Sequence, residues 1–203
     1  MEKSVANLDV SRDIFLRGLR RCPTHAALWQ AYAKLESEAG ELEKARKLFA
    51  KGADRCPHSA SLLHAWAYFE LHRGRHRHAS ELLRQAVDID ATAAEGFVVQ
   101  ALLEMKQSQT TRARATVERG LELDPTHGPL YRILGSLQDL EGDTEGARQS
   151  FRKGLDLNPT YAQLYHAWAR LEGKVLNWEA LAELNKRAKL AFPNMEGRPE
   201  YGE

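Results

Sequence analysis

The sequence lacks several features by which classes of protein are recognised. It contains no apolar run of roughly 18 residues, the length that crosses a bilayer, so we expect no membrane span. It also lacks an excess of one charge, because 29 basic and 28 acidic residues give a net charge of +1. A dedicated polyanion binder usually has a clear excess of basic residues, so any nucleic-acid role would require local clustering of positive charge.

Motifs for catalysis and metal binding are also missing. There is no glycine-rich phosphate loop, no nucleophile elbow and no closely spaced cysteine pair. The basic run "HRGRHRH" at 72–78 supplies three histidines, yet no cysteine or carboxylate completes a metal site there. This run is either a solvated turn or a phosphate contact. We therefore predict a protein that is not an enzyme and carries no metal or cofactor.

What the sequence does have is a period of 34 residues. The phrase "LWQAYAKLE" at 28–36 returns as "LYHAWARLE" at 164–172, four periods later. A proline marks nearly every step, and the marker positions are Pro23, Pro57, Ala91, Pro125, Pro159 and Pro193. Self-similarity at such a spacing is typical of stacked helical repeats.

Each period contains two apolar series separated by a helix-breaking residue. A large residue stands six places after the marker and a small one ten places after it, and a second series at spacings of three and four follows the breaker. The breakers are Gly40, Gly74, Ser108 and Gly142. This predicts an all-α fold, a right-handed α-solenoid of antiparallel helix pairs, each with a helix A and a helix B.

The register predicts one repeat array over residues 1–203. A lone helix B at 8–21 comes first, so further repeats are expected before residue 8. The five repeats cover 23–56, 57–90, 91–124, 125–158 and 159–192, and 193–203 form a C-terminal tail. A glutamate in helix A and an arginine ten residues later, such as Glu36 with Arg46 and Glu104 with Arg114, predict an ion pair that ties helix A to its own helix B.

The two cysteines occupy the same position in successive repeats. Cys22 and Cys56 each precede a marker proline. Equivalent points on packed helices lie about 8–10 Å apart, beyond the roughly 7 Å that a disulfide allows between Cα atoms. We therefore predict two free thiols and an intracellular, reducing compartment.

The repeats resemble the half-a-TPR (HAT) repeat, a TPR-like motif. The resemblance rests on the helix-A pattern of aromatic, aromatic and glutamate, and on "ARKLFAKG" and "ARQSFRKG" in helix B. It implies an RNA-processing scaffold that binds single-stranded RNA, protein partners in a larger complex, or both, and that stabilises or matures transcripts. It favours the chloroplast over the nucleus. The alternative is a protein-protein interaction adaptor that holds a helix or peptide.

The resemblance also implies a groove lined by positions seven, eleven and fourteen after the marker. The candidate RNA-binding residues are Lys34, His64, Tyr68, Arg132, His166 and Arg170. The candidate partner-binding residues, expected to face solvent as an apolar stripe, are Tyr68, Leu71, Val98, Leu102 and Met105. Two alternatives stay open at this point: tight curvature or a neighbouring side chain buries the stripe, and the cations are ordinary solvated side chains.

Overall fold

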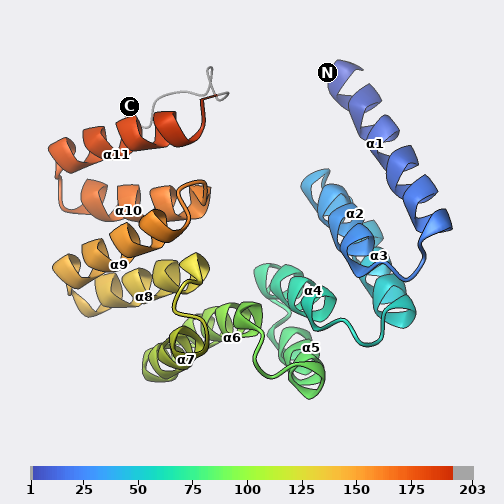
Figure 1. Ribbon diagram of the computed structural model, residues 1–203, viewed down its shortest axis with the longest axis horizontal. Coiled ribbons are helices and arrows are strands. Elements are labelled where there is room, and N and C mark those ends of the chain that lie inside the picture. Colours follow the sequence, from blue (N-terminus) through green and yellow to red (C-terminus); the bar gives the residue numbers. More distant parts are fainter. Residues whose placement is uncertain (1, 194–203) are drawn as a thin grey trace. The chain divides into compact units, whose positions relative to one another are not determined.

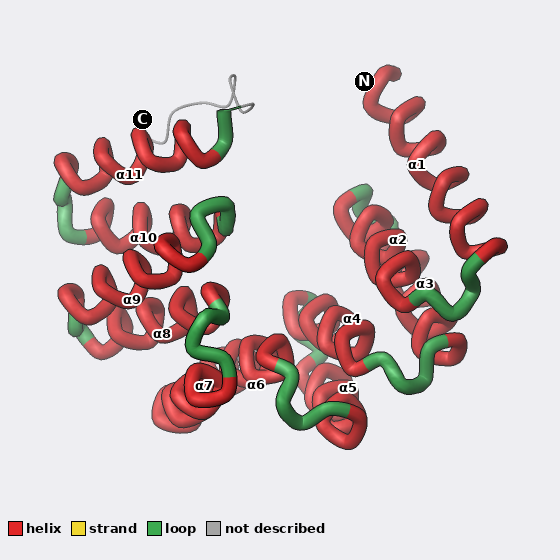
Figure 2. The backbone as a smooth tube through the Cα atoms, viewed as in Figure 1, coloured by secondary structure: helices red, strands yellow, loops and turns green. Residues whose placement is uncertain are grey.

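The computed structural model describes the backbone of residues 2–193 and the side chains of residues 8–193. Within these residues the chain is helical and has no strand (Figure 2). The described helices, labelled in Figure 1, are α1 (Glu2–Arg21), α2 (Ala26–Glu38), α3 (Leu42–Arg55), α4 (Ala60–His72), α5 (His76–Ile89), α6 (Ala94–Lys106), α7 (Thr110–Leu123), α8 (Gly128–Glu141), α9 (Thr144–Leu157), α10 (Ala162–Lys174) and α11 (Trp178–Ala191). The predicted C-terminal tail, apart from Pro193, lies outside the described residues.

The chain divides into two compact units, Met1–Leu103 and Glu104–Glu203. In the N-terminal unit α2 pairs with α3 and α4 with α5, and in the C-terminal unit α8 pairs with α9 and α10 with α11. The even-numbered helices from α2 to α10 are the A helices, and the odd-numbered ones are the B helices. The predicted all-α fold, a solenoid of antiparallel helix pairs, is confirmed.

Small residues let the paired helices approach. Ala33 and Ala67 of the A helices are 0% exposed, as are Ala45 and Ala79 of the B helices. In α8 the equivalent residue is Gly135, where a Cβ would lie 2.5 Å from the Phe151 ring of α9. The α8–α9 pair is therefore packed too closely at this point for any larger residue unless Phe151 moves.

The breaker residue ends each A helix in the left-handed region. The backbone φ angles of Gly40, Gly74 and Gly142 are 84°, 73° and 85°. The residues one period apart from them, Ser108 and Leu176, also take positive φ angles, 59° and 55°. The turn geometry is thus imposed by the fold even where the residue carries a side chain that opposes it.

The large residue six places after the marker also closes the loop before helix A. Three of these side chains donate a hydrogen bond back to the carbonyl of their own marker proline, a role beyond the predicted space filling. The bonds are Trp29 to Pro23 (2.8 Å), Tyr131 to Pro125 (3.0 Å) and Tyr165 to Pro159 (3.0 Å).

The predicted arginine partner within the repeat is wrong, although Lys44 of α3 does bind Glu36 of its own repeat at 2.7 Å. Glu36 accepts hydrogen bonds from Arg12 of α1 (2.9 and 2.8 Å), which precedes it by 24 residues. Arg46 does not bind Glu36 but donates to Glu70 of α4, again 24 residues away (2.8 Å). Arg114 likewise donates to Glu141. The arginine of a B helix thus binds the glutamate of the following A helix and joins successive repeats.

Candidate functional site

The N-terminal unit presents a polar and aromatic surface on two adjacent A helices. We call it the α2/α4 face and define it by Lys34, Ser37, Tyr68, His72 and Arg73. Arg73, directly after α4, donates to the hydroxyl of the half-buried Ser37 of α2 at 3.5 Å, which links the C-terminal ends of the two helices. Tyr68 is 42% exposed. Its ring centroid lies 4.1 Å from that of His72, and His72 Nδ1 donates to the Tyr68 carbonyl at 2.9 Å, which fixes the imidazole beside the phenol.

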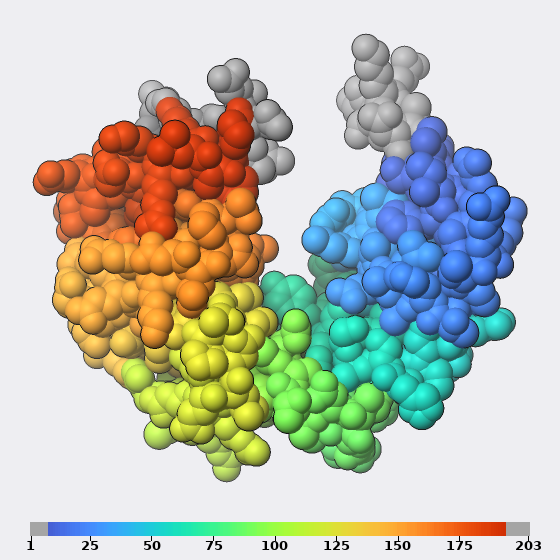
Figure 3. Space-filling model, viewed as in Figure 1, coloured from blue at the N-terminus to red at the C-terminus, as the bar shows by residue number. Residues whose placement is uncertain are grey.

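The C-terminal unit has a comparable surface of A helices, which pack in one compact stack with α9 and α11 (yellow to red in Figure 3). We call it the α8/α10 face and define it by Arg132, Asp139, His166, Arg170 and Lys174. Lys174 binds Asp139 at 2.7 Å, and the Arg132 Nε donates to the Tyr161 hydroxyl at 3.3 Å. Two of its cations are therefore already engaged within the protein.

One candidate RNA-binding residue is wrongly placed by the sequence. His64 is 3% exposed, and neither ring nitrogen has a hydrogen-bond partner. Its imidazole lies against Gly96, where a Cβ would come within 2.9 Å of Nε2. Burial lowers the pKa of His64, which Glu95 and Asp90 only partly oppose, so the ring is neutral near pH 7. A buried neutral ring cannot contact a phosphate.

The other RNA-binding candidates divide between the two faces. Lys34 and Tyr68 lie on the α2/α4 face, while Arg132, His166 and Arg170 lie on the α8/α10 face. All but Arg132 are exposed, and Arg132 is half-buried beside Tyr161. Their role in binding stays a prediction.

The predicted apolar stripe is largely part of the core. Leu71 and Val98 are 2% and 9% exposed, so the expectation that they face solvent is wrong. Leu71 belongs to the cluster formed by α4, α5 and α6, and Leu102 packs against the same cluster. Met105 is half-buried, so Tyr68 is the one exposed member of the five. Burial by neighbouring helices, the alternative left open above, accounts for Leu71, Val98 and Leu102.

The glutamates repeated in the A helices are structural and not available to a ligand. Glu36, Glu70 and Glu172 are each 0% exposed. At Glu172 the hydrogen bonds from Arg148 outweigh burial and hold its pKa below the ordinary value, with help from the Trp168 indole, which donates at 2.8 Å. Sequence reasoning missed this indole, although a tryptophan four residues before the glutamate also stands in α4.

The state of the two cysteines agrees with the prediction from the sequence. Cys22 and Cys56 are both free, as predicted. Burial raises the pKa of the Cys56 thiol, which disfavours the reactive thiolate. Among residues 2–193, none of the helices has the length and apolar character needed to cross a membrane. The reducing compartment stays a prediction.

Family models for the tetratricopeptide repeat match two stretches of the chain, residues 26–69 and 98–162. Both begin in or beside an A helix and end in a later one, and together they cover just over half of the chain. The chain belongs to the tetratricopeptide repeat (TPR) family. No curated protein sequence shows significant similarity to this TPR protein.

Solved structures share the fold at low sequence identity. A chain of the APC/C hetero-tetramer Cut9-Hcn1 matches 92% of this TPR protein at 16% identity, with a TM-score of 0.74, but this protein spans only 37% of that chain. PilW, a type IV pilus biogenesis factor, matches 96% of this TPR protein at 19% identity, with a TM-score of 0.66, and the match covers 90% of the PilW chain. YrrB, a TPR protein with an unusual peptide-binding site, matches 89% at 18% identity (TM-score 0.50, 93% of its chain).

These matches support membership of the TPR family and do not assign the chain to a subgroup such as the HAT repeats. The family models describe TPR repeats, and the three structures are an APC/C subunit, a peptide-binding TPR protein and a pilus biogenesis factor. Because all three are below 20% identity, they establish the fold of this chain and not its partner.

Proposed function

We propose that this TPR protein is a non-catalytic adaptor that binds a segment of a protein partner through its α2/α4 face. The observation that carries this proposal is the exposed Tyr68 ring, held by His72, on a face that also carries the cations Lys34 and Arg73. A rigid tyrosine with a polar rim is the kind of residue that dominates binding energy at protein interfaces.

The surroundings of Tyr68 define the chemistry of the partner segment. Lys34 lies near one acidic residue, Glu38 (3.8 Å), in an exposed pair that contributes little and is easily exchanged. Arg73 lies over the Phe69 ring at 5.7 Å, which holds its guanidinium at the surface. A segment with an apolar side chain over Tyr68 and a carboxylate beside Lys34 or Arg73 fits this face. Peptide binding by YrrB and assembly in the APC/C are consistent precedents within the fold.

The competing proposal is the finer one that the HAT resemblance implies, an RNA-processing scaffold that binds single-stranded RNA. Its cations would be Arg132 and Arg170 on the α8/α10 face, with Tyr68 for base stacking. Arg132 is hydrogen-bonded to Tyr161 and Lys174 to Asp139, so both would have to exchange a partner for a phosphate. We favour the adaptor because peptide binding by YrrB and assembly in the APC/C are the precedents within this fold. The compartment, chloroplast over nucleus, stays a prediction.

The test begins with peptides selected on the purified protein from a phage-displayed random library. Binding of the selected peptides is then measured by fluorescence anisotropy to the wild type and to Tyr68→Ala. We expect Tyr68→Ala to weaken binding at least about tenfold. The matched control is Val87→Ala, which removes a side chain of 53% exposure from the B helix α5 and should change nothing.

The same assay separates the two proposals. A labelled mixed-sequence single-stranded RNA is titrated at about 50 and 200 mM salt, where phosphate-driven binding falls steeply. Tight, salt-sensitive RNA binding that Arg170→Ala weakens, with no peptide selected, would overturn the adaptor proposal. Peptide binding that depends on Tyr68, without RNA binding, would support it.

A further inference from the structure

Helix α1 is a B helix with no A helix beside it among the described residues. It packs on α2 of the next repeat, yet its other side is open. Ile14 of α1 stands where α3 has Leu48 and α5 has Leu82. Those leucines are 9% and 2% exposed because their own A helices cover them, whereas Ile14 is 58% exposed. Val10, one turn earlier, is 59% exposed. α1 therefore presents the surface that other B helices bury.

The glycine of α1 shows the same one-sided packing. At Gly52 of α3, an added Cβ would meet Trp29 of its own A helix at 2.8 Å and Leu62 of the next A helix at 3.1 Å. At Gly18 of α1 it would meet only Leu28 of the next A helix, at 3.3 Å. Gly154 repeats the two-sided contact, with Tyr131 and Leu164. One side of Gly18 therefore has room for a large side chain.

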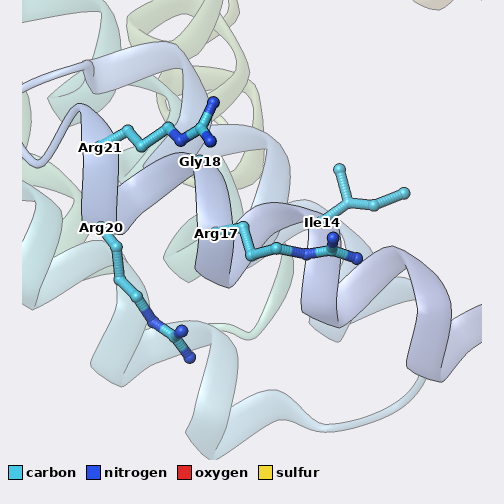
Figure 4. A pocket seen from close by; sticks show the side chains of 5 residues that line it. All are labelled: Ile14, Arg17, Gly18, Arg20 and Arg21. Carbon is cyan, nitrogen blue, oxygen red and sulfur yellow. The ribbon is translucent and has the colours of Figure 1, made fainter.

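The open side of α1 is basic. Arg17, Arg20 and Arg21 line an open cavity of about 510 Å³ together with Ile14 and Gly18 (Figure 4). Arg17 is partly neutralised by Asp13. Arg20 reverses the usual charge of its position, which is acidic in the other B helices from α3 to α9. Those residues are Asp54, Asp88, Glu122 and Asp156.

We propose that this α1 surface docks an acidic amphipathic helix of a protein partner. The helix takes the place of an A helix and sets an aromatic or leucine side chain against Gly18 and Ile14. Because paired helices run antiparallel, its N-terminal turn lies beside Arg20 and Arg21, and acidic residues there also suit the positive end of the helix dipole. This surface is separate from the α2/α4 face, so the proposal is independent of the proposed function.

The test uses the full chain and a probe taken from its own sequence. A fluorescent peptide with residues 24–39, the first A helix, is made in two versions. In the acidic version Thr24 and Ala27 are replaced by Glu, and in the basic version both are replaced by Lys. We expect the acidic peptide to bind at least about tenfold more tightly than the basic one, as measured by anisotropy at low salt.

Two variants of α1 locate the binding, with one matched control. Ile14→Asp should weaken the acidic peptide about tenfold or more. Leu16→Asp is the control, because Leu16 is also exposed (43%) and its equivalents Arg84, Glu118 and Arg152 face solvent. Arg20→Asp, which restores the charge found in the other repeats, should abolish the preference for the acidic peptide. Circular dichroism checks that each variant is folded.

Three results would overturn the proposal. The first is equal binding of the acidic and basic peptides to the wild type. The second is an equal loss in Ile14→Asp and Leu16→Asp. The third is self-association in sedimentation experiments that Ile14→Asp removes, because the occupant would then be a second copy of this chain. Tyr68→Ala should leave peptide binding at α1 unchanged, so failure here and failure of the adaptor proposal are distinguishable.

Discussion

Arg148 and Glu172 are 24 residues apart on helices of different repeats, and two hydrogen bonds of 2.8 Å join them. Arg148 belongs to the B helix α9, and Glu172 to the following A helix α10. The carboxylate is 0% exposed and the arginine 26%. The bond therefore does not close a repeat but fastens one repeat to the next, in addition to the covalent chain.

Removing the arginine should leave a buried carboxylate without its cation. We expect Arg148→Met to lower the free energy of unfolding by about 3 kcal/mol, because the cost of an uncompensated buried charge exceeds the gain of an apolar side chain. Urea unfolding followed by circular dichroism measures it. Arg152→Met on the exposed side of the same helix is the control and should change stability little. Equal effects of the two variants would contradict the structural role of the pair.

The pH dependence of stability should report on His64. Its pKa is lowered in the folded state from an ordinary value of 6.5, because burial disfavours the imidazolium. The folded state then binds fewer protons than the unfolded one, so stability is full above pH 6.5 and falls as the pH drops below it, by at most about 1.4 kcal/mol per pH unit.

A matched pair of variants isolates this effect. His64→Leu should flatten the pH dependence of the melting temperature between about pH 7 and 5, the range in which histidines titrate. Gln30→Leu, at the same repeat position but without a titratable group, should leave the slope as it is in the wild type. A slope that persists in His64→Leu would show that another group causes it.

The turn after α10 carries a residue unsuited to its backbone. Leu176 has a φ of 55° and is 67% exposed, so it has strain without burial to offset it. Leu176→Gly should raise stability by about 1 kcal/mol. Gly142→Ala, at the equivalent turn after α8, should lower it by a similar amount. Thermal unfolding of the wild type and the two variants measures both changes in stability. A lower stability of Leu176→Gly would show that the Leu176 side chain makes a contact that outweighs the backbone strain.

The α8–α9 contact should show strong coupling between two residues. Gly135→Ala adds a methyl group where the Phe151 ring already lies, so we expect it to cost about 1–3 kcal/mol despite the better helix propensity of alanine. The double variant with Phe151→Leu recreates the combination of Ala67 and Leu83 found in α4 and α5. The double variant should recover part of the stability lost in Gly135→Ala. If the effects of the two single substitutions on stability simply add, that result would count against the clash.

The period, the helix pairs and the turns could be predicted from the sequence because each follows from local spacing. The partner of each arginine could not. Arg46 is ten residues after Glu36 and 24 before Glu70, and in a 34-residue repeat these two assignments look alike. The last repeat held the missing signal. Glu172 has Ala182 ten residues later and Arg148 24 residues before it, so only the preceding arginine can pair with it.

The burial of His64 shows a second limit of predicting a residue's environment from its position in the repeat. Its position was assigned to a groove by analogy with the other repeats, but Gly96 stands where the other A helices have Leu28, Leu62, Leu130 and Leu164. The missing side chain leaves space in the core, and the His64 ring lies against that glycine. A single exception to the repeat pattern thus changes the environment of a residue 32 positions earlier.

Each of these arginine–glutamate bonds between repeats joins an arginine to a glutamate of the following repeat, so the two ends of a repeat are not equivalent. If α10 and α11 were removed, Arg148 would be left as a cation at the new end, where water solvates it readily. If instead α9 were removed ahead of α10, Glu172 would lose the cation that balances a carboxylate of 0% exposure. At this contact the C-terminal unit can therefore be trimmed from its C-terminal side at lower cost than from its N-terminal side.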